Sequence, residues 1–346
     1  MAGMTTRHSA ILLIPFLTLA GCSKPAPRIV LYCAQDQEFA EGVLGEFTKR
    51  TGLPVVPKYD TEATKSVSLA AELAMEAKRP RCDVHWNNEI IGTIKLQRQG
   101  VYEPYASPAA EPYPAWAKAA DHTWLAFASR ARVIVVNTQQ VAEADRPKGL
   151  LDLTDPKWKG KIAIAKPLFG TTATQAAALF AALGPDAAKE FYRGLKANGV
   201  QVVAGNKHVA EGVARGQYAV GLTDTDDALG EIEAGRPLAM IFPDRDGDPR
   251  QPKLGVLYIP NTLAIIRGCP NQAGAKPLVD YLLSPEVEAK LAEGPSHQIP
   301  LNPNVKAKLP PGLATPDQVK VMQVDWEKAA DLWDDSQRFL ADEFGR

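Results

Sequence analysis

Short apolar runs alternate with helix-like segments along the first hundred residues of this 346-residue chain. The runs predict strands at 28–33, 55–59 and 82–86. Apolar residues at helical spacing predict helices at 38–50, 64–78 and 90–99. Because strands and helices alternate, the sequence predicts a parallel sheet with helices on both faces, an α/β fold. Ligands of such sheets bind beyond the carboxyl ends of the strands.

The same alternation returns in the middle of the chain and predicts a second α/β unit. Its predicted strands are 126–137, 162–165, 200–204 and 218–222. Its predicted helices are 173–183, 206–216 and one that ends at Ala234. Two more strands are expected at 254–259 and 263–266, and the rest of the chain is expected to be helical. The apolar face of 326–339 is expected to pack onto the first unit.

Polar loops follow the predicted strands of the first unit, and each loop carries a carboxylate. These loops are Ala34-Gln35-Asp36, Asp60-Thr61-Glu62 and Asn87-Asn88-Glu89. In the second unit, Gly170-Thr171-Thr172 opens one helix and Asn206 opens another. Since the ends of parallel strands lie at one edge of a sheet, these loops are candidates for a binding site.

The amino terminus has the layout of a secretory signal, with an apolar run at 11–20 that ends in Leu19-Ala20-Gly21-Cys22. The run is too short to span a bilayer, which takes about 20 apolar residues. Because a cysteine directly follows Leu-Ala-Gly, the segment resembles a bacterial lipoprotein signal. We therefore expect residues 1–21 to be removed, Cys22 to carry lipid, and 22–27 to be a tether. The alternative is an ordinary signal peptide with a chance cysteine.

Composition excludes several classes of function. The formal net charge is -1 and no basic block occurs, which argues against a nucleic-acid partner. Cys33, Cys82 and Cys269 form no CxxC pair, so neither a zinc site nor a redox pair is indicated. No signature of a serine hydrolase, metalloprotease, kinase or P-loop enzyme is present, so no enzyme is expected.

The order of these parts, together with six short segments, resembles the periplasmic solute-binding proteins of ABC importers. The segments are Val30-Leu31-Tyr32, 47–52, Cys82-Asp83-Val84, 130–133, 151–162 and Ile259-Pro260-Asn261-Thr262. More narrowly, the chain resembles the ferric-ion-binding branch and its relatives that bind phosphorylated or phosphonate solutes. The resemblance implies a monomer with the type II fold, outside the cytoplasm, that delivers its ligand to an ABC permease and touches the membrane only through its lipid.

The resemblance also implies a division of the chain. Two α/β lobes would close on a ligand about two crossing strands. The first lobe would be 28–125 with 267–346, the second lobe 138–253, and the crossings 126–137 and 254–266.

The ferric site of that branch is not kept in this sequence. Its two adjacent tyrosines correspond to Thr225 and Asp226, and its histidine corresponds to Asp36. Its acidic ligand corresponds to Asn88 or Glu89. The resemblance therefore implies that the phenolate iron site is missing, while the anion-binding half is better kept.

Two hypotheses for the ligand follow. The first is an anion, such as a phosphate or phosphonate ester, or a metal–anion pair, held by Thr171, Thr172, Asn206 and Arg130. The second is a bare hard cation held by Asp36, Glu89, Asp224 and Asp226, because such cations prefer oxygen ligands. No cofactor is expected beyond this possible metal ion. The full candidate set is Asp36, Asn88, Glu89, Arg130, Gly170, Thr171, Thr172, Asn206, Thr223, Asp224, Thr225 and Asp226.

Simpler explanations stand beside both hypotheses. The acids and hydroxyls at 223–227 are also typical of helix capping. Arg130 could equally form a salt bridge at the hinge, and paired carboxylates across a cleft could serve a hydrolase. Finally, 244–248 resembles part of a calcium loop, but it lacks the distal glutamate and is predicted to be a charged turn.

Overall fold

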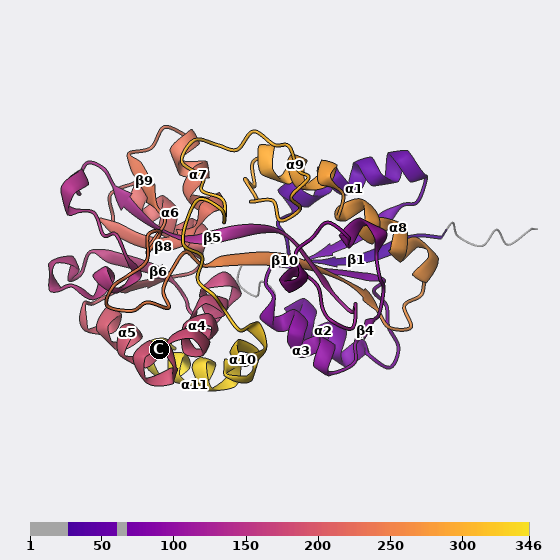
Figure 1. Ribbon diagram of the computed structural model, residues 1–346, viewed down its shortest axis with the longest axis horizontal. Helices are drawn as coiled ribbons and strands as arrows, with labels where there is room; N and C mark the ends of the chain where they lie inside the picture. Colours follow the sequence, from indigo (N-terminus) through magenta and orange to yellow (C-terminus); the bar gives the residue numbers. More distant parts are fainter. Residues whose placement is uncertain (1–26, 61–67, 346) are drawn as a thin grey trace, which may run out of the picture.

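The computed structural model describes residues 27–60 and 68–345. The signal, Cys22 and the rest of the predicted tether up to residue 26 lie outside these residues, as does the start of the helix predicted at 64–78. Figure 1 shows two α/β lobes side by side, with β5 and β10 running between them. Within the described residues, no helix is both long and apolar enough to cross a membrane.

The amino-terminal lobe is built around a short parallel sheet. Its strands are β1 (Ile29–Cys33), β2 (Val55–Tyr59), β3 (Val84–Asn87) and β4 (Tyr102–Glu103). Its helices are α1 (Gln37–Thr51), α2 (Ser68–Glu76), α3 (Ile91–Arg98), α8 (Gln272–Leu282) and α9 (Pro285–Glu293). β1 pairs in parallel with both β2 and β3. Helix α1 ends where Gly52 takes φ 71°, a left-handed conformation that glycine adopts without strain.

The second lobe repeats this plan. Its strands are β6 (Ile162–Ala165), β7 (Gln201–Val203), β8 (Val220–Asp224) and β9 (Leu238–Ile241). Its helices are α4 (Gly170–Leu183), α5 (Pro185–Ala197), α6 (Asn206–Ala214) and α7 (Thr225–Glu233). β6 pairs in parallel with β7 and β8, so the carboxyl ends of these strands share one edge.

Two long strands connect the lobes, β5 (Leu125–Asn137) and β10 (Tyr258–Ile266). The first half of β5 pairs with β10 and its second half with β8, both antiparallel. The expectation of a parallel sheet therefore holds for β1, β2 and β3 and for β6, β7 and β8. It fails at the connecting strands, with which β4 and β9 also pair antiparallel. β10 is one strand with a register shift at Pro260/Asn261, not the two strands expected from the sequence. A further link is a bridge between Ser129 and Ile299.

A buried carboxylate anchors the start of β5. Glu288, on α9, is fully buried and accepts hydrogen bonds from the backbone amides of Ala128, Leu301 and Asn302 at 2.5, 3.1 and 2.8 Å. Ala128 has φ 35°, an unfavourable value for a residue with a side chain. Glu288 therefore stabilises the backbone at the point where the chain leaves the first lobe.

The carboxyl-terminal segment differs from expectation. Residues 294–325 contain no helix, and two helices follow, α10 (Trp326–Asp331) and α11 (Trp333–Phe344). α10 contacts both α3 and α4, whereas α11 contacts α4 and α5 of the second lobe. The rings of Phe339 and Phe180 lie 6.1 Å apart. The prediction that 326–339 packs onto the first lobe therefore holds for α10, which also contacts the second lobe, and fails for α11, because helical periodicity reveals an apolar face and not its partner.

The charged turn predicted at 244–248 is present, and its first residue is buried. Asp244 has φ 56° and accepts a hydrogen bond from the Leu150 amide at 3.1 Å. Burial raises the pKa of Asp244 to about 6, and the nearby carboxylates Asp248 and Asp152 contribute in the same direction. The carboxyl group of Asp244 is therefore more easily protonated than an ordinary aspartate.

This raised pKa predicts a pH-dependent stability. Between pH 4 and 6 Asp244 holds a larger share of a proton in the folded chain than in the unfolded chain, so its contribution to the free energy of unfolding falls as pH rises through that window. Replacing Asp244 by Asn, which tolerates positive φ, should remove about 2–3 kcal/mol of this fall. Urea unfolding of both proteins at pH 4, 5, 6 and 7 measures the difference. Parallel stability profiles would contradict the assignment.

Candidate functional site

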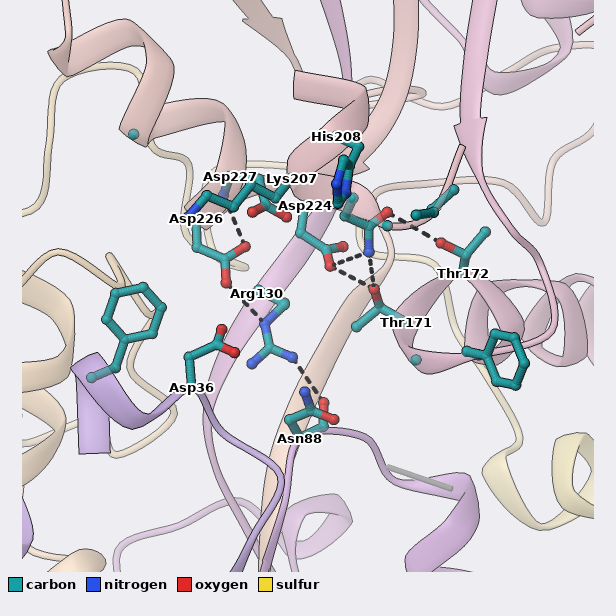
Figure 2. Close-up of a pocket in the computed structure, with 18 of the residues that line it drawn as sticks. Asp36, Asn88, Arg130, Thr171, Thr172, Lys207, His208, Asp224, Asp226 and Asp227 are labelled. Atoms are coloured by element: carbon teal, nitrogen blue, oxygen red, sulfur yellow. Dashed lines mark hydrogen bonds and ion pairs between the residues drawn. The ribbon is translucent and has the colours of Figure 1, made fainter. Parts of the chain in front are cut away.

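A cavity of about 860 Å³ lies between the lobes, at the carboxyl ends of the parallel strands. Figure 2 shows its centre, with Asp36 and Asn88 contributed by the first lobe and the other labelled residues by β5, α4, α6, the end of β8 and the start of α7. Nine of the predicted residues line it: Asp36, Asn88, Arg130, Gly170, Thr171, Thr172, Asn206, Asp224 and Asp226. The structure therefore brings together residues that are up to 190 positions apart in the sequence.

Two helices begin at the cavity wall. The residues that precede α4 and α6 are Phe169 and Gly205, and neither provides a side-chain cap. The first amides of a helix have no partner inside the helix, and they attract negative charge. Lys207 and His208 line the same wall. This side of the cavity is therefore suited to an anion.

Asp224 and Arg132 form a buried ion pair behind this wall. Arg132 Nη1 lies 2.7 Å from Asp224 Oδ1, and the Arg132 side chain is fully buried. Thr171 Oγ1 and Asn206 Nδ2 donate to Asp224 Oδ2 at 2.5 and 3.0 Å. Arg132 Nη1 also donates to Asn206 Oδ1 at 2.9 Å. The network holds the amino-terminal ends of α4, α6 and α7 in fixed positions.

Arg130 connects the two lobes across the floor of the cavity. Its Nη1 donates to the backbone oxygen of Asn88 at 2.8 Å, and its Nη2 donates to Gln35 Oε1 at 3.0 Å. Its Nε lies 3.4 Å from Asp226 Oδ2, on α7 of the second lobe. The guanidinium is thus engaged with both lobes, which favours the hinge salt bridge over a bidentate contact with the ligand.

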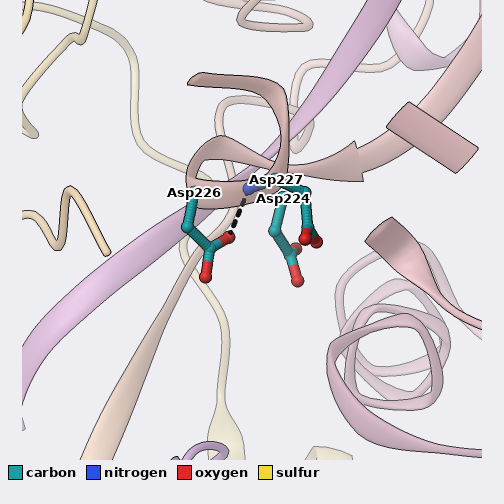
Figure 3. Close-up of side chains that lie close together, drawn as sticks. All are labelled: Asp224, Asp226 and Asp227. Atoms are coloured by element: carbon teal, nitrogen blue, oxygen red, sulfur yellow. Dashed lines mark hydrogen bonds between the residues drawn. The ribbon is translucent and has the colours of Figure 1, made fainter. Parts of the chain in front are cut away.

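Three carboxylates meet at the start of α7, as Figure 3 shows. Asp224, Asp226 and Asp227 each offer an oxygen within 4.8 Å of the others, a spacing that could hold a metal ion. Asp224 is buried, whereas Asp226 and Asp227 are partly exposed. Both oxygens of Asp224 already accept hydrogen bonds from Arg132, Thr171 and Asn206, so a metal would have to compete with these donors.

Three predicted ligand residues are not among the described residues that line the cavity. Glu89 is buried and accepts from the amides of Ile91 and Gly92 at 2.7 and 2.8 Å, which caps α3. Thr223 Oγ1 donates to the backbone oxygen of Asn206 at 2.9 Å, and Thr225 Oγ1 accepts from the Ala131 amide at 3.2 Å. These side chains bond to the backbone, but neither threonine caps α7, and Asp224, which precedes α7, makes no side-chain cap, so the capping alternative for 223–227 is not what the structure shows.

The carboxylate of Glu89 is therefore engaged by the amides at the start of α3 and does not line the cavity. Burial raises its pKa, and its hydrogen-bond donors oppose that shift. Thr174 on α4 also donates to Glu89 Oε2 at 3.2 Å, so this carboxylate touches the second lobe.

Several residues of the cavity wall were not predicted from the sequence, including Lys166, Lys207 and His208. Lys207 and His208 directly follow Asn206 at a predicted helix start, which is the signal that could have found them. Arg132 was also missed as a candidate. A second arginine two positions after Arg130, inside a mostly apolar strand of 13 residues, indicates a buried polar network.

Two α/β lobes, crossing strands and a polar cavity between the lobes define a solute-binding protein with the type II fold of periplasmic binding proteins. The chain belongs to the family described as bacterial extracellular solute-binding protein, whose match covers residues 94–331.

Known proteins support this assignment. The chain is 28% identical over 281 residues to the major ferric iron-binding protein of Neisseria meningitidis, covering 80% of this chain and 82% of that protein. It is also 28% identical over 332 residues to an uncharacterized protein of Haemophilus influenzae, covering 92% and 91%. The relatives whose role is described are binding proteins.

Solved structures agree on the fold. Iron-bound HitA from Pseudomonas aeruginosa has a TM-score of 0.80 at 20% identity, covering 91% of this chain and 99% of that one. AfuA from Actinobacillus pleuropneumoniae, with fructose-6-phosphate bound, has a TM-score of 0.78 at 25% identity, covering 92% and 99%. The expectation of a binding protein rather than an enzyme is confirmed by the family and its relatives.

Proposed function

We propose that this protein captures a small organic phosphate or phosphonate ester that also carries hydroxyl groups. One observation carries the proposal: the cavity combines two uncapped helix starts, with Lys207 and His208 beside them, and carboxylates that include Asp36 of the first lobe and Asp227 at the start of α7. A phosphate-type group is stabilised at helix amino termini. Hydroxyl groups donate hydrogen bonds to carboxylates such as Asp36 and Asp227.

The size of the cavity supports an organic ligand. A volume of about 860 Å³ lies within the range of roughly 300–1,000 Å³ that is typical of small-molecule sites. A bare ion would leave most of this space to water. The structural similarity to AfuA with fructose-6-phosphate bound points in the same direction.

Ferric iron is the second candidate, favoured by the carboxylate cluster at Asp224, Asp226 and Asp227 and by the iron-binding relatives. Two observations count against it. The described residues that line the cavity include no tyrosine. Asp224 is also paired with Arg132, whose positive charge would repel a metal ion. Iron is therefore retained as an outcome to be tested, either alone or with an anion.

We further propose that the protein works as a monomer outside the cytoplasm, anchored by lipid at Cys22, and delivers its ligand to an ABC permease. The lobes would be divided as expected from the sequence, except that α11 belongs with α4 and α5. Labelling with radioactive palmitate should mark the wild-type protein and not Cys22→Ala. Equal labelling of the two would contradict the anchor.

The hydroxyls at the start of α4 should matter for binding. Thr171 donates to Asp224, and Thr172 Oγ1 donates to Asn206 Oδ1 at 3.1 Å. The double variant Thr171→Val, Thr172→Val should bind the best ester in a calorimetric panel at least about tenfold more weakly, about 1.4 kcal/mol. Thr48→Val is the matched control, because Thr48 bonds only within the α1 region, outside the cavity. Unchanged affinity in the double variant would exclude this wall from the site.

A further inference from the structure

The carboxylate of Asp224 occupies a set of donors that is typical of a bound anion. It receives one hydrogen bond each from a guanidinium, a hydroxyl and an amide: Arg132 Nη1, Thr171 Oγ1 and Asn206 Nδ2. Asp224 is 4% exposed and Arg132 is 0% exposed. Figure 2 shows the hydrogen bond between Thr171 and Asp224 at the wall of the cavity.

The donor set exceeds what Asp224 satisfies. Arg132 Nη2 is buried and has no hydrogen-bond partner among the described residues. The amino-terminal turns of α4 and α6, which carry Thr171 and Asn206, lack side-chain caps. Buried donors of this kind normally find a partner, and charged ones bind oxyanions. Arg132, Thr171 and Asn206 therefore form an oxyanion position, and the side chain of Asp224 occupies it.

We propose that Asp224 is a specificity-determining residue that occupies this oxyanion position and keeps free inorganic anions out of it. An inorganic anion that approached Arg132, Thr171 and Asn206 would lie next to the buried carboxylate of Asp224. Two negative charges at such short range repel each other strongly. A ligand must instead present a hydrogen-bond donor to Asp224 and place its own anionic group elsewhere on the wall. This inference adds a specificity-determining residue to the proposed function. It rests on the proposed function in one respect, namely that the ligand binds in this cavity.

The test is a gain of binding. Asp224→Ala vacates the position while Arg132, Thr171 and Asn206 remain. Calorimetry with sodium formate and with inorganic phosphate should give affinities at least tenfold higher for Asp224→Ala than for wild type. Formate should also raise the melting temperature of Asp224→Ala more than that of wild type, with sodium chloride at equal ionic strength as the reference.

Asp226→Ala is the matched control, because it removes one carboxylate from the same cavity but leaves the donors of Asp224 untouched. It should gain no affinity for formate or phosphate. An equal gain in Asp226→Ala would show a general charge effect and overturn the proposal. Tight binding of either anion by the wild type would overturn it as well.

Asp224→Ala leaves Arg132 buried without its partner, so the variant can fail to fold. Asp224→Asn is nearly isosteric: it removes the negative charge and replaces one acceptor oxygen by an NH2 group, but it leaves the position filled. It should bind phosphate more tightly than wild type, though less tightly than a folded Asp224→Ala. The lack of any gain in Asp224→Asn would overturn the claim that the charge of Asp224 keeps inorganic anions out. The proposed function is judged separately, by wild-type binding of organic esters, so the two can fail independently.

Discussion

Arg132→Met is expected to abolish ligand binding and to lower the free energy of unfolding by about 3–5 kcal/mol. Arg132 is fully buried, and its guanidinium bonds to Asp224, Thr171, Asn206 and Gln175. Removing one member of a buried ion pair leaves the other charge unpaired, which is strongly destabilising. It also removes the hydrogen bonds by which Arg132 joins the starts of α4 and α6 to Asp224. Urea unfolding and calorimetry with an organic phosphate ester measure the two effects.

A double variant separates stability from binding. Arg132→Met with Asp224→Leu removes both charges and should recover most of the lost stability, because apolar replacements of buried ion pairs are often neutral. It should not recover binding, since the wall of the cavity has lost its polar network. If Arg132→Met alone left both stability and binding unchanged, Arg132 would not organise the site.

Glu288→Ala is expected to cost about 3–5 kcal/mol in the free energy of unfolding. The change leaves the buried amides of Ala128, Leu301 and Asn302 without their acceptor, and each such group costs about 1–3 kcal/mol. Since Ala128 lies near the start of the crossing strand β5 and has an unfavourable φ, the hinge should also loosen. Urea unfolding measures the stability, and hydrogen exchange at 125–131 measures the loosening.

Glu293→Ala is the matched control on the same helix. Glu293 is exposed and accepts from one backbone amide, that of Lys308, so its removal should cost less than about 1 kcal/mol. Equal losses for the two variants would show that α9, and not the carboxylate of Glu288, provides the stability.

The elements that the sequence predicted well are those with a strong local pattern. β2 and β6 have the predicted bounds, and the start of α6 at Asn206 is as predicted. β10 was split in two because Pro260 and Asn261 interrupt the apolar pattern, whereas the sheet tolerates them at a register shift. The last helix, α11, was assigned to the wrong lobe, and α10 contacts both lobes, because packing partners are set by tertiary contacts.

The candidate site shows the same limit. Strand ends placed Asp36, Thr171, Asn206 and Asp226 at the cavity correctly. Glu89 has the same sequence context, yet its side chain turns back to the amides of α3. A loop position predicts where the backbone lies, while the direction of the side chain depends on local donors that the sequence does not reveal.

Calorimetry on the full mature chain tests the central claim most directly. The ligands are glucose 6-phosphate, fructose 6-phosphate, 2-aminoethylphosphonate, inorganic phosphate, and ferric citrate with free citrate as its control. The account predicts that at least one organic ester binds with micromolar or tighter affinity, while inorganic phosphate and ferric citrate bind at least a hundredfold more weakly. Tight binding of ferric ion, with no binding of any organic ester, would contradict the account and identify an iron-binding protein with an unusual ligand set.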